Sequence, residues 1–285
     1  MELRALTWNL FHGRDFPPDP GLLTWRSRLL GTSERNATHL QVNRDLLEAF
    51  GAVLSGADWD VALLQECPPR WSEPLAEATG ADAHRALTSR NSLAPLRAAA
   101  ARLNPDLIAS NEGGSNLTLA RAAVLERREL ELTPGPRPER RAMAFTRIRP
   151  RAGGPEVSLA NLHASAGAAR SAEAEREVLL AAERATAWAG GGALVLGGDL
   201  NLRPRESDVF EELERRFGLR PPTAPGALDH LLARGLEPLE PPASWAPDRR
   251  EVTVEGLAIR LSDHAPVQAR FAPPAGRPPP PPAPR

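Results

Sequence analysis

Polar side chains recur at the ends of short apolar segments of the sequence. The residues of this kind are Glu66, Asp199, Asn201, Asp229, Asp263 and His264. Carboxylates, amides and imidazoles are the groups that ligate cations and transfer protons. Because α/β folds place their sites at the mouths of buried strands, the recurrence indicates that these side chains serve one site.

Each of these segments also has an ordinary structural interpretation. Glu66 could be a solvated strand end or the partner of a helix cap, and the Gly-Gly-Asp-Leu-Asn segment that ends at Asn201 could be a strand-exit turn. The adjacent pair Asp263 and His264 could likewise form a turn. No segment distinguishes these alternatives alone, so the interpretation depends on their combination.

The elements that must position these groups follow from the spacing of apolar residues. Strands are expected at 3–10, 60–66, 116–120, 122–132, 142–149, 156–163, 193–201, 228–233, near 251–261 and at 265–271. Helical spacing predicts a helix at 36–54, and richness in Ala, Glu, Arg and Leu predicts one at 168–189. A further helix is expected at about 206–217, with short helices and loops over 68–112. The strands between 116 and 163 are expected to be antiparallel neighbours, with 134–138 as one connection. This alternation predicts an α/β architecture with mixed sheets.

The composition is that of a globular protein. The chain has 285 residues, 41% of them hydrophobic, which is enough to bury one large core or two modest ones. We predict a single domain over 1–272 and a Pro-rich, polyproline-like or disordered tail over 273–285. The single cysteine, Cys67, excludes an intramolecular disulfide, and no apolar run approaches the roughly 20 residues needed to span a bilayer. No export signal is visible, so a cytoplasmic location is expected.

The charge pattern leaves the binding partner open. The formal net charge is −1, and all 35 basic residues are Arg, a side chain suited to bidentate contact with phosphate. A GC-rich genome would produce the same bias. The near-neutral balance lacks the overall basic charge of a dedicated nucleic-acid binder, although a local basic stripe is compatible with it.

Seven short motifs occur along the chain in a particular order. They are Thr7-Trp-Asn9, Leu64-Gln-Glu66, Gly113-Gly-Ser-Asn-Leu-Thr-Leu119, Asn161-Leu-His163, Gly197-Gly-Asp-Leu-Asn201, Leu228-Asp-His230 and Leu261-Ser-Asp-His-Ala-Pro-Val267. In this order they resemble the motifs of the endonuclease/exonuclease/phosphatase superfamily, which includes deoxyribonuclease I-like nucleases, abasic-site endonucleases, bacterial sphingomyelinases and inositol polyphosphate 5-phosphatases. The resemblance implies a four-layer α/β sandwich, in which helices flank two packed mixed β-sheets and the active site lies at one end.

The resemblance also implies a chemistry. A divalent-metal-dependent phosphoesterase needs charge neutralised on the phosphate, an in-line water and a proton for the departing alkoxide. The implied ligands of Mg²⁺ or Mn²⁺ are Asn9, Glu66 and Asp263. The implied catalytic residues are His163, Asp199, Asn201, Asp229 and His264, and Asn116 corresponds to a position close to the substrate.

Each catalytic residue has an implied role. Asp199 and Asn201 would orient the attacking water and a phosphate oxygen. Asp229 would hold His264, which contacts the phosphate, in one tautomer. His163 would be the general acid near the leaving oxygen.

The remaining histidines and the segment 12–35 are assigned no catalytic role. His12, His39 and His84 lie outside the motifs and are expected to be surface or loop residues, and His230 is expected to point away from Asp229. The segment 12–35 reads as an insertion rich in Arg. A loop that packs its Trp25 into a core is favoured over one that grips phosphates and stacks a base.

Departures from subfamily patterns narrow the substrate. The chain contains no Tyr, whereas abasic-site endonucleases place a tyrosine where His163 stands. Inositol 5-phosphatases carry Trp-Cys-Asp-Arg where this chain reads Ala227-Leu-Asp-His230. A phosphodiesterase or nuclease is favoured, with nucleic acid among the candidate substrates. The alternatives are a phospholipid or inositol-phosphate phosphoesterase and a non-catalytic binding relative, and the presence of every expected carboxylate argues against the last.

Overall fold

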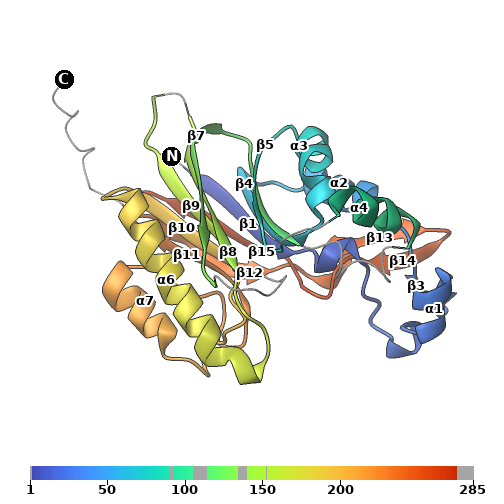
Figure 1. Cartoon of the computed structure of the whole chain (residues 1–285). Helices are drawn as coiled ribbons and strands as arrows, with labels where there is room; N and C mark the ends of the chain where they lie inside the picture. The colour runs from blue at the N-terminus through green and yellow to red at the C-terminus, as the bar shows by residue number, and fades with distance from the viewer. Residues whose placement is uncertain (1, 90–92, 105–113, 134–139, 152, 275–285) are drawn as a thin grey trace.

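Two β-sheets pack face to face in the computed structural model, which describes residues 2–89, 93–104, 114–133, 140–151 and 153–274 (Figure 1). The first sheet has the order β12 (Glu237–Ser244), β15 (Val267–Ala272), β1 (Leu3–Asn9), β4 (Val61–Cys67), β6 (Ser115–Ala120) and β5 (Asp82–Leu87). The second has the order β11 (Asp229–Arg234), β10 (Ala193–Asp199), β9 (Val157–His163), β8 (Ala142–Arg149) and β7 (Ala123–Glu131). Both sheets are mixed, as predicted.

Helices cover the outer face of each sheet, which gives the predicted four layers (Figure 1). On the first sheet lie α2 (Leu47–Gly56), α3 (Ser72–Thr79) and the hairpin of β13 (Glu251–Val254) and β14 (Leu257–Arg260). On the second lie α6 (Ser171–Ala189) and α7 (Val209–Phe217). The buried stripe of α6 is largely alanine, so this helix approaches the sheet closely.

A separate apolar cluster fills the space between the sheets. It is built from inward-facing side chains such as Leu3, Val61, Leu159, Val195 and Phe271. The central strands β1, β4, β9 and β10 are buried on both faces, which explains why the sequences of β4 and β10 read as short apolar runs rather than as alternating ones.

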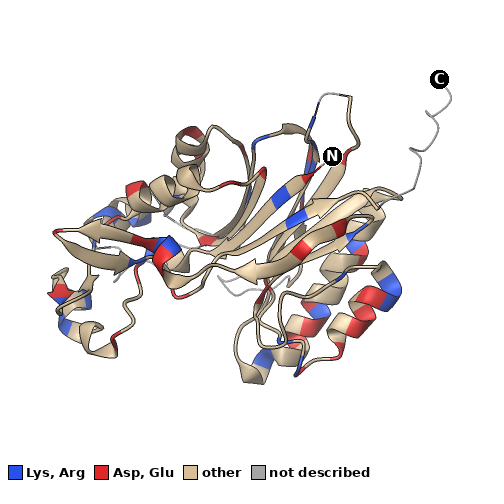
Figure 2. Cartoon of the chain, turned by 180° about the vertical axis from the view of Figure 1, so that it is seen from behind, with Lys and Arg blue, Asp and Glu red and all other residues tan. Residues whose placement is uncertain are grey.

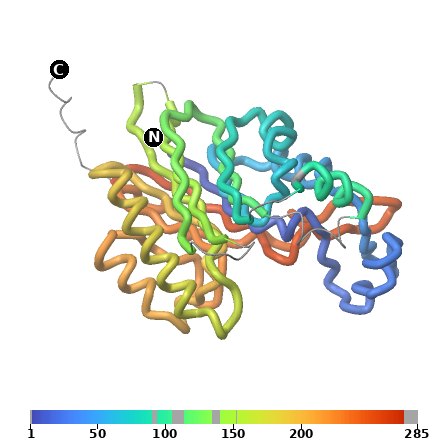
Figure 3. Tube along the Cα trace, viewed as in Figure 1, coloured from blue at the N-terminus to red at the C-terminus, as the bar shows by residue number. Residues whose placement is uncertain are grey.

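Strand direction brings the predicted site residues to one end of the sandwich. β1 runs parallel to β4, and β9 runs parallel to β10, so their carboxyl ends coincide in pairs. β15 pairs antiparallel with β1, so the first and last strands of the described chain lie side by side (Figure 3). The segment that precedes β15 therefore lies beside the end of β1.

Several predicted elements need correction. The helix predicted for 36–54 begins only at Leu47, because the side chain of Asn36 accepts the N–H groups of Thr38 and His39 in a turn that competes with a helix. A short strand, β3 (Leu40–Gln41), occupies part of that range, and it pairs with β2 (Glu34–Arg35) just before the range. The strand β6 pairs with β4 and β5 rather than with β7, so the predicted run of four neighbouring strands is wrong at its first member. Both faces of β6 are buried, and its pattern therefore did not identify its sheet.

Two strands and two helices complete the description. The prediction missed β12, where prolines are tolerated because it is an edge strand, and β5, which pairs with β6 at the opposite edge. The short helices are α1 (Trp25–Leu30) and α4 (Ala94–Leu103). The predicted connection at 134–138 and most of the predicted tail, residues 275–285, lie outside the described residues, and the division into one domain and a tail stays a prediction.

Charge is mixed over the surface. Acidic and basic residues occur together on both α6 and α7 (Figure 2), in keeping with a formal net charge of −1. Among the described residues, no helix is both long and apolar enough to cross a bilayer.

Candidate active site

Asn9 connects the two sheets at the carboxyl end of β1. Its Nδ2 donates a hydrogen bond of 3.0 Å to Oδ2 of Asp199, at the end of β10. The same amide group also lies close enough to the carboxylate of Glu66 in β4 to contribute to lowering the pKa of that carboxyl group. Its Oδ1 accepts the backbone N–H of Phe11 at 2.9 Å. One buried side chain therefore ties together the ends of three strands.

Asp199 is the most central carboxylate of the group. It lies opposite His163 in the parallel pairing with β9 and opposite Asp229 in the antiparallel pairing with β11. The backbone N–H of Asn201 donates to its Oδ1 at 3.1 Å. Burial raises the pKa of Asp199, and the charge of Asp229 raises it further, so this carboxyl group has the enhanced basicity that a proton acceptor requires.

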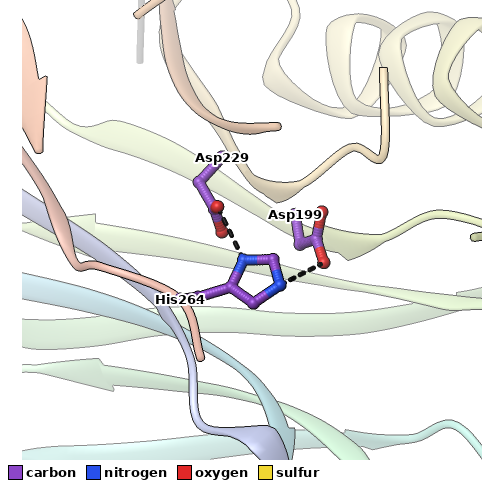
Figure 4. Close-up of side chains that lie close together, drawn as sticks. All are labelled: Asp199, Asp229 and His264. Atoms are coloured by element: carbon purple, nitrogen blue, oxygen red, sulfur yellow. Dashed lines mark hydrogen bonds and ion pairs between the residues drawn. The ribbon is translucent and has the colours of Figure 1, made fainter. Parts of the chain in front are cut away.

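His264 lies between two carboxylates (Figure 4). Its Nδ1 is 2.8 Å from Oδ2 of Asp229, and its Nε2 is 3.8 Å from Oδ2 of Asp199. Burial by itself would lower the pKa of His264, but the hydrogen bond to Asp229 and the surrounding carboxylates outweigh burial and raise it. The imidazole is thus held as a cation near neutral pH. The expected contact with Asp229 is present, and its catalytic role stays a prediction.

The His163 ring lies close to the carboxylates of Asp199 and Glu66 and to the guanidinium of Arg141. Its Nε2 lies 3.5 Å from Oδ2 of Asp199 and 3.7 Å from Oε1 of Glu66. The guanidinium NH1 of Arg141 lies 3.3 Å from its Nδ1. Burial lowers the pKa of His163 to about 3, with Arg141 contributing. Since Arg can only donate, Nδ1 is the acceptor, and the ring proton resides on Nε2, facing the carboxylates.

Glu66 occupies an irregular position in β4. The pairing of β4 with β6 shifts register between Leu64 and Cys67, and Glu66 has a φ of 49°, in the left-handed region. The bulge turns its carboxylate towards two imidazoles, with Oε2 3.2 Å from Nε2 of His12. Burial alone would raise the pKa of Glu66, but the charges of the neighbouring imidazoles, His12 foremost, outweigh burial and lower it.

The segment that carries Asp263 and His264 is held by hydrogen bonds between side chains and backbone groups. The hydroxyl of Ser262 donates to the carbonyl of Asn9 at 2.6 Å and accepts the N–H of His264 at 3.0 Å. The indole Nε1 of Trp8 donates to the carbonyl of His264 at 3.0 Å. Burial raises the pKa of Asp263, and the charges of Glu66 and Asp229 contribute to the rise. The carboxylates of Glu66 and Asp263 are therefore close enough to interact electrostatically.

Close packing of β10 against its neighbours explains why two glycines, Gly197 and Gly198, precede Asp199. A Cβ at Gly198 would lie 1.8 Å from the carbonyl oxygen of Leu162, and its φ is +141°. A Cβ at Gly197 would lie 2.7 Å from Leu231 Cδ2. Side chains at these positions would push β10 away from its neighbours, so the glycines are required for Asp199 to stand beside His163.

A buried polar network lies directly beneath the site. Nε2 of Gln65 donates to Oδ1 of Asn161 at 2.8 Å and to the hydroxyl of Thr7 at 3.1 Å. Nδ2 of Asn161 donates to the carbonyl of Leu64 at 3.2 Å. These contacts join the two sheets next to the strand ends. The sequence displayed these residues within the motifs without indicating this role.

The side-chain amides of Asn201 and Asn116, both predicted to be functional, also donate hydrogen bonds to backbone carbonyls. Nδ2 of Asn201 donates to the carbonyl of Ala164 at 3.0 Å, beside His163. Nδ2 of Asn116 donates to the carbonyl of Ala142 at 2.6 Å, and its buried Oδ1 has no partner among the described residues. A place for Asn116 in substrate binding stays a prediction.

Four residues that were assigned no catalytic role can be compared with the structure. His230 is buried and bonded to backbone groups, which confirms its structural role. His84 is not a surface residue, because it is buried in β5 with Nδ1 2.8 Å from the hydroxyl of Thr146. Trp25 is 74% exposed, so the preferred interpretation of a core tryptophan is wrong. His12 lies in the turn after β1, as expected of a loop histidine, but its ring contacts Glu66, so it borders the site.

The donor set fits a hard divalent cation. Oxygen donors predominate, and burial raises the pKa of Asp263 with a smaller contribution from the charge of Glu66, a cost of placing carboxylates here that a bound cation would offset. Oδ1 of Asn9 accepts one hydrogen bond and has a second lone pair. The group Asp199, Asp229 and His264, whose ligand atoms lie within 4.8 Å of one another, could also hold an ion. In that group, however, Nδ1 of His264 already faces Asp229.

Comparison with known proteins places this geometry in a family. The family model for the endonuclease/exonuclease/phosphatase family matches residues 6–264. A search of curated proteins finds no match. The fold is similar to a mannosyl-6-phosphatase from Bacteroides thetaiotaomicron (TM-score 0.62, 13% identity, covering 95% of this chain and 99% of that one). It is also similar to the human Nocturnin catalytic domain with a bound sulfate anion (TM-score 0.61, 14% identity, covering 95% and 94%).

A third similar structure is truncated Caenorhabditis elegans TDP2 (TM-score 0.57, 15% identity, covering 95% of this chain and 97% of that one). At these identities the structures show the shared fold, whereas the family match covers nearly all of the described site from β1 to His264. The chain therefore belongs to the endonuclease/exonuclease/phosphatase family of phosphoester hydrolases.

Proposed function

We propose that the protein is a divalent-metal-dependent phosphodiesterase that cleaves its substrate by in-line attack of water, with nucleic acid as the first candidate substrate. The observation that carries the proposal is the His264 imidazole, which lies between Asp229 and Asp199 next to the Asn9 bridge. The protonated imidazole of His264 and the carboxylate of Asp199 thus lie next to the oxygen atoms of the proposed metal ligands, at one end of the sandwich.

The metal site would consist of Glu66, Asp263 and Asn9. Mg²⁺ or Mn²⁺ bound there would neutralise charge on the non-bridging phosphate oxygens. The lowered pKa of Glu66 supports this assignment, because a ligand carboxylate must be ionised.

The attacking water would be oriented and deprotonated by Asp199. The hydrogen bonds from Asn9 and from the backbone of Asn201 fix the plane of this carboxylate. Protonated His264 would contact a non-bridging phosphate oxygen, and Asp229 would keep its Nε2–H directed into the site.

His163 would act at the leaving oxygen. Because its pKa is lowered to about 3, the ring is neutral at working pH, so it would donate a hydrogen bond from Nε2 to the leaving oxygen, and the departing alkoxide would take its proton from water rather than from His163. Arg141 would maintain this tautomer by occupying Nδ1.

A substrate panel tests the proposal. Plasmid DNA, RNA, bis-p-nitrophenyl phosphate, p-nitrophenyl phosphate, sphingomyelin and inositol phosphates would be incubated with the protein and Mg²⁺ or Mn²⁺, with and without excess EDTA. We expect metal-dependent hydrolysis of DNA, RNA or the diester, abolished by EDTA and by His264→Ala. Hydrolysis confined to sphingomyelin or to monoesters would assign the phospholipid or phosphatase alternative, and binding without hydrolysis would indicate a non-catalytic relative. The cytoplasmic location stays a prediction.

A further inference from the structure

The turn after β1 holds an unusual backbone conformation. Phe11, His12 and Gly13 have φ values of 50°, 54° and 78°, so two consecutive residues with side chains occupy the left-handed region. Such residues persist only where their surroundings enforce them, and they cluster at functional sites. His12 and Glu66, which face each other, are both of this kind.

The surroundings of the turn account for its conformation. Asn9 accepts the N–H of Phe11, and Gly13 donates to the carbonyl of Leu10 at 2.8 Å. Trp71 packs against Gly13 so closely that a Cβ there would lie 2.3 Å from the indole. The guanidinium carbon of Arg14 lies 4.4 Å from the centroid of the Phe11 ring. The fold thus imposes the turn.

The His12 ring is held in place without full hydrogen bonding. Its Nε2 lies 3.2 Å from Oε2 of Glu66, while its Nδ1 is buried and has no partner among the described residues. An unpaired buried nitrogen and a left-handed backbone both oppose folding, so stability alone does not explain a histidine here. What the ring does accomplish is contact with Glu66.

We propose that His12 is a positioning residue for the metal site, acting through Glu66. Its Nε2 restrains Oε2 of Glu66, so the other oxygen, Oε1, is directed towards His163, 3.7 Å away, at the centre of the site. The inference rests on the proposed metal-dependent function. Mutation of a residue that orients a metal ligand from behind typically costs roughly 10- to 100-fold in metal affinity or activity.

Two amide substitutions separate contact from backbone strain. In His12→Gln the amide nitrogen can reach the position of Nε2, whereas in His12→Asn the side chain is one methylene shorter and cannot reach Glu66. Asn tolerates the left-handed region well, so His12→Asn removes the contact without adding strain. His12→Gly, which adopts this φ freely, provides a second variant without the contact. The matched control is His39→Asn, since Nε2 of His39 also lies 3.3 Å from a carboxylate, Oε1 of Glu251, away from the site.

The measurement is the Kd for Mn²⁺, from electron paramagnetic resonance of the free ion, with the Tm of each metal-free variant as a test of folding. We expect His12→Asn and His12→Gly to weaken Mn²⁺ binding about 10- to 100-fold, with His12→Gln within about threefold of the wild type. The control should bind as the wild type does. Unchanged affinity in folded His12→Asn or His12→Gly would overturn the proposal, as would an equal loss in His12→Gln, which would mark the imidazole as a direct ligand. A wild-type protein that binds no Mn²⁺ would overturn the metal-dependent function itself.

Discussion

Asp229 and His264 form a hydrogen-bonded pair across the two sheets, with 2.8 Å between Oδ2 and Nδ1. Asp229 begins β11 of the second sheet, and His264 precedes β15 of the first. The carboxylate fixes the imidazole tautomer and favours its protonated form. The pair therefore depends on correct packing of the sandwich as well as on both side chains.

Asp229→Asn should lower kcat about 10²- to 10⁴-fold while leaving the fold intact. The amide has nearly the same shape, but it can present N–H to Nδ1 and favour the wrong tautomer. Asp199→Asn should be comparably damaging, because it weakens the group that receives the proton of water. Since Asp229 and His264 would act as a unit, the double variant Asp229→Asn/His264→Ala should be little worse than the poorer single variant. Fully additive losses in kcat under saturating Mg²⁺ would show that the two residues work independently.

Glu66→Gln should abolish metal-dependent hydrolysis and reduce the rise in Tm on adding Mn²⁺. The amide keeps the shape of the side chain but removes the charge that a hard cation prefers. Glu73→Gln, at an exposed position in α3, is the control. Activity that persists in excess EDTA, or a Mn²⁺ response that survives in Glu66→Gln, would contradict this metal site.

Arg141→Met should lower kcat at least about tenfold, because Nδ1 of His163 would lose the donor that keeps the ring proton on Nε2. The neighbouring Arg140, whose NH1 lies 3.3 Å from Oε2 of Glu131, offers a matched control. Arg140→Met should retain wild-type activity. Equal kcat values for Arg141→Met and the wild type, with Tm unchanged, would remove Arg141 from the site.

Gly198→Ala should destabilise the protein by about 3 kcal/mol or more, because a Cβ would overlap the carbonyl of Leu162 in a backbone conformation that alanine rarely adopts. At Gly191 a Cβ meets nothing within 4 Å, so Gly191→Ala should change stability little. Urea unfolding of both variants measures the difference. A Gly198→Ala protein as stable as the wild type would mean that β10 shifts freely, and it would weaken the argument that this glycine sets the position of Asp199.

Stability should fall in mild acid partly through His84. Burial lowers the pKa of His84 to about 4 from its ordinary 6.5. Between these values the unfolded chain binds a proton that the folded chain excludes, so the contribution is fully present above pH 6.5 and is lost as the pH falls towards 4, by up to about 3 kcal/mol. His84→Gln should show a smaller difference in unfolding free energy between pH 7 and pH 4.5. Identical differences in the two proteins would show that His84 stays solvated.

Local pattern was sufficient for the elements whose signals are strong. Short apolar runs predicted β4 and β10, a mostly alternating pattern predicted β1, and richness in Ala, Glu, Arg and Leu predicted α6, because the burial of a strand and the propensity for a helix depend directly on local residue types. The polar residues at the ends of these strands were visible for the same reason. Parallel pairing of β1 with β4 and of β9 with β10 then makes their ends coincide.

Tertiary structure decided which groups meet. The sheet that β6 joins, the burial of His84, and the contacts of Arg141 with His163 and of His12 with Glu66 all join residues far apart in the chain. Composition and periodicity carry no signal for such contacts, since they depend on strand order and on a left-handed turn that the surrounding packing imposes. Residue order thus specified the chemical groups and the strand ends that carry them, whereas long-range packing selected the neighbours that set their protonation and direction.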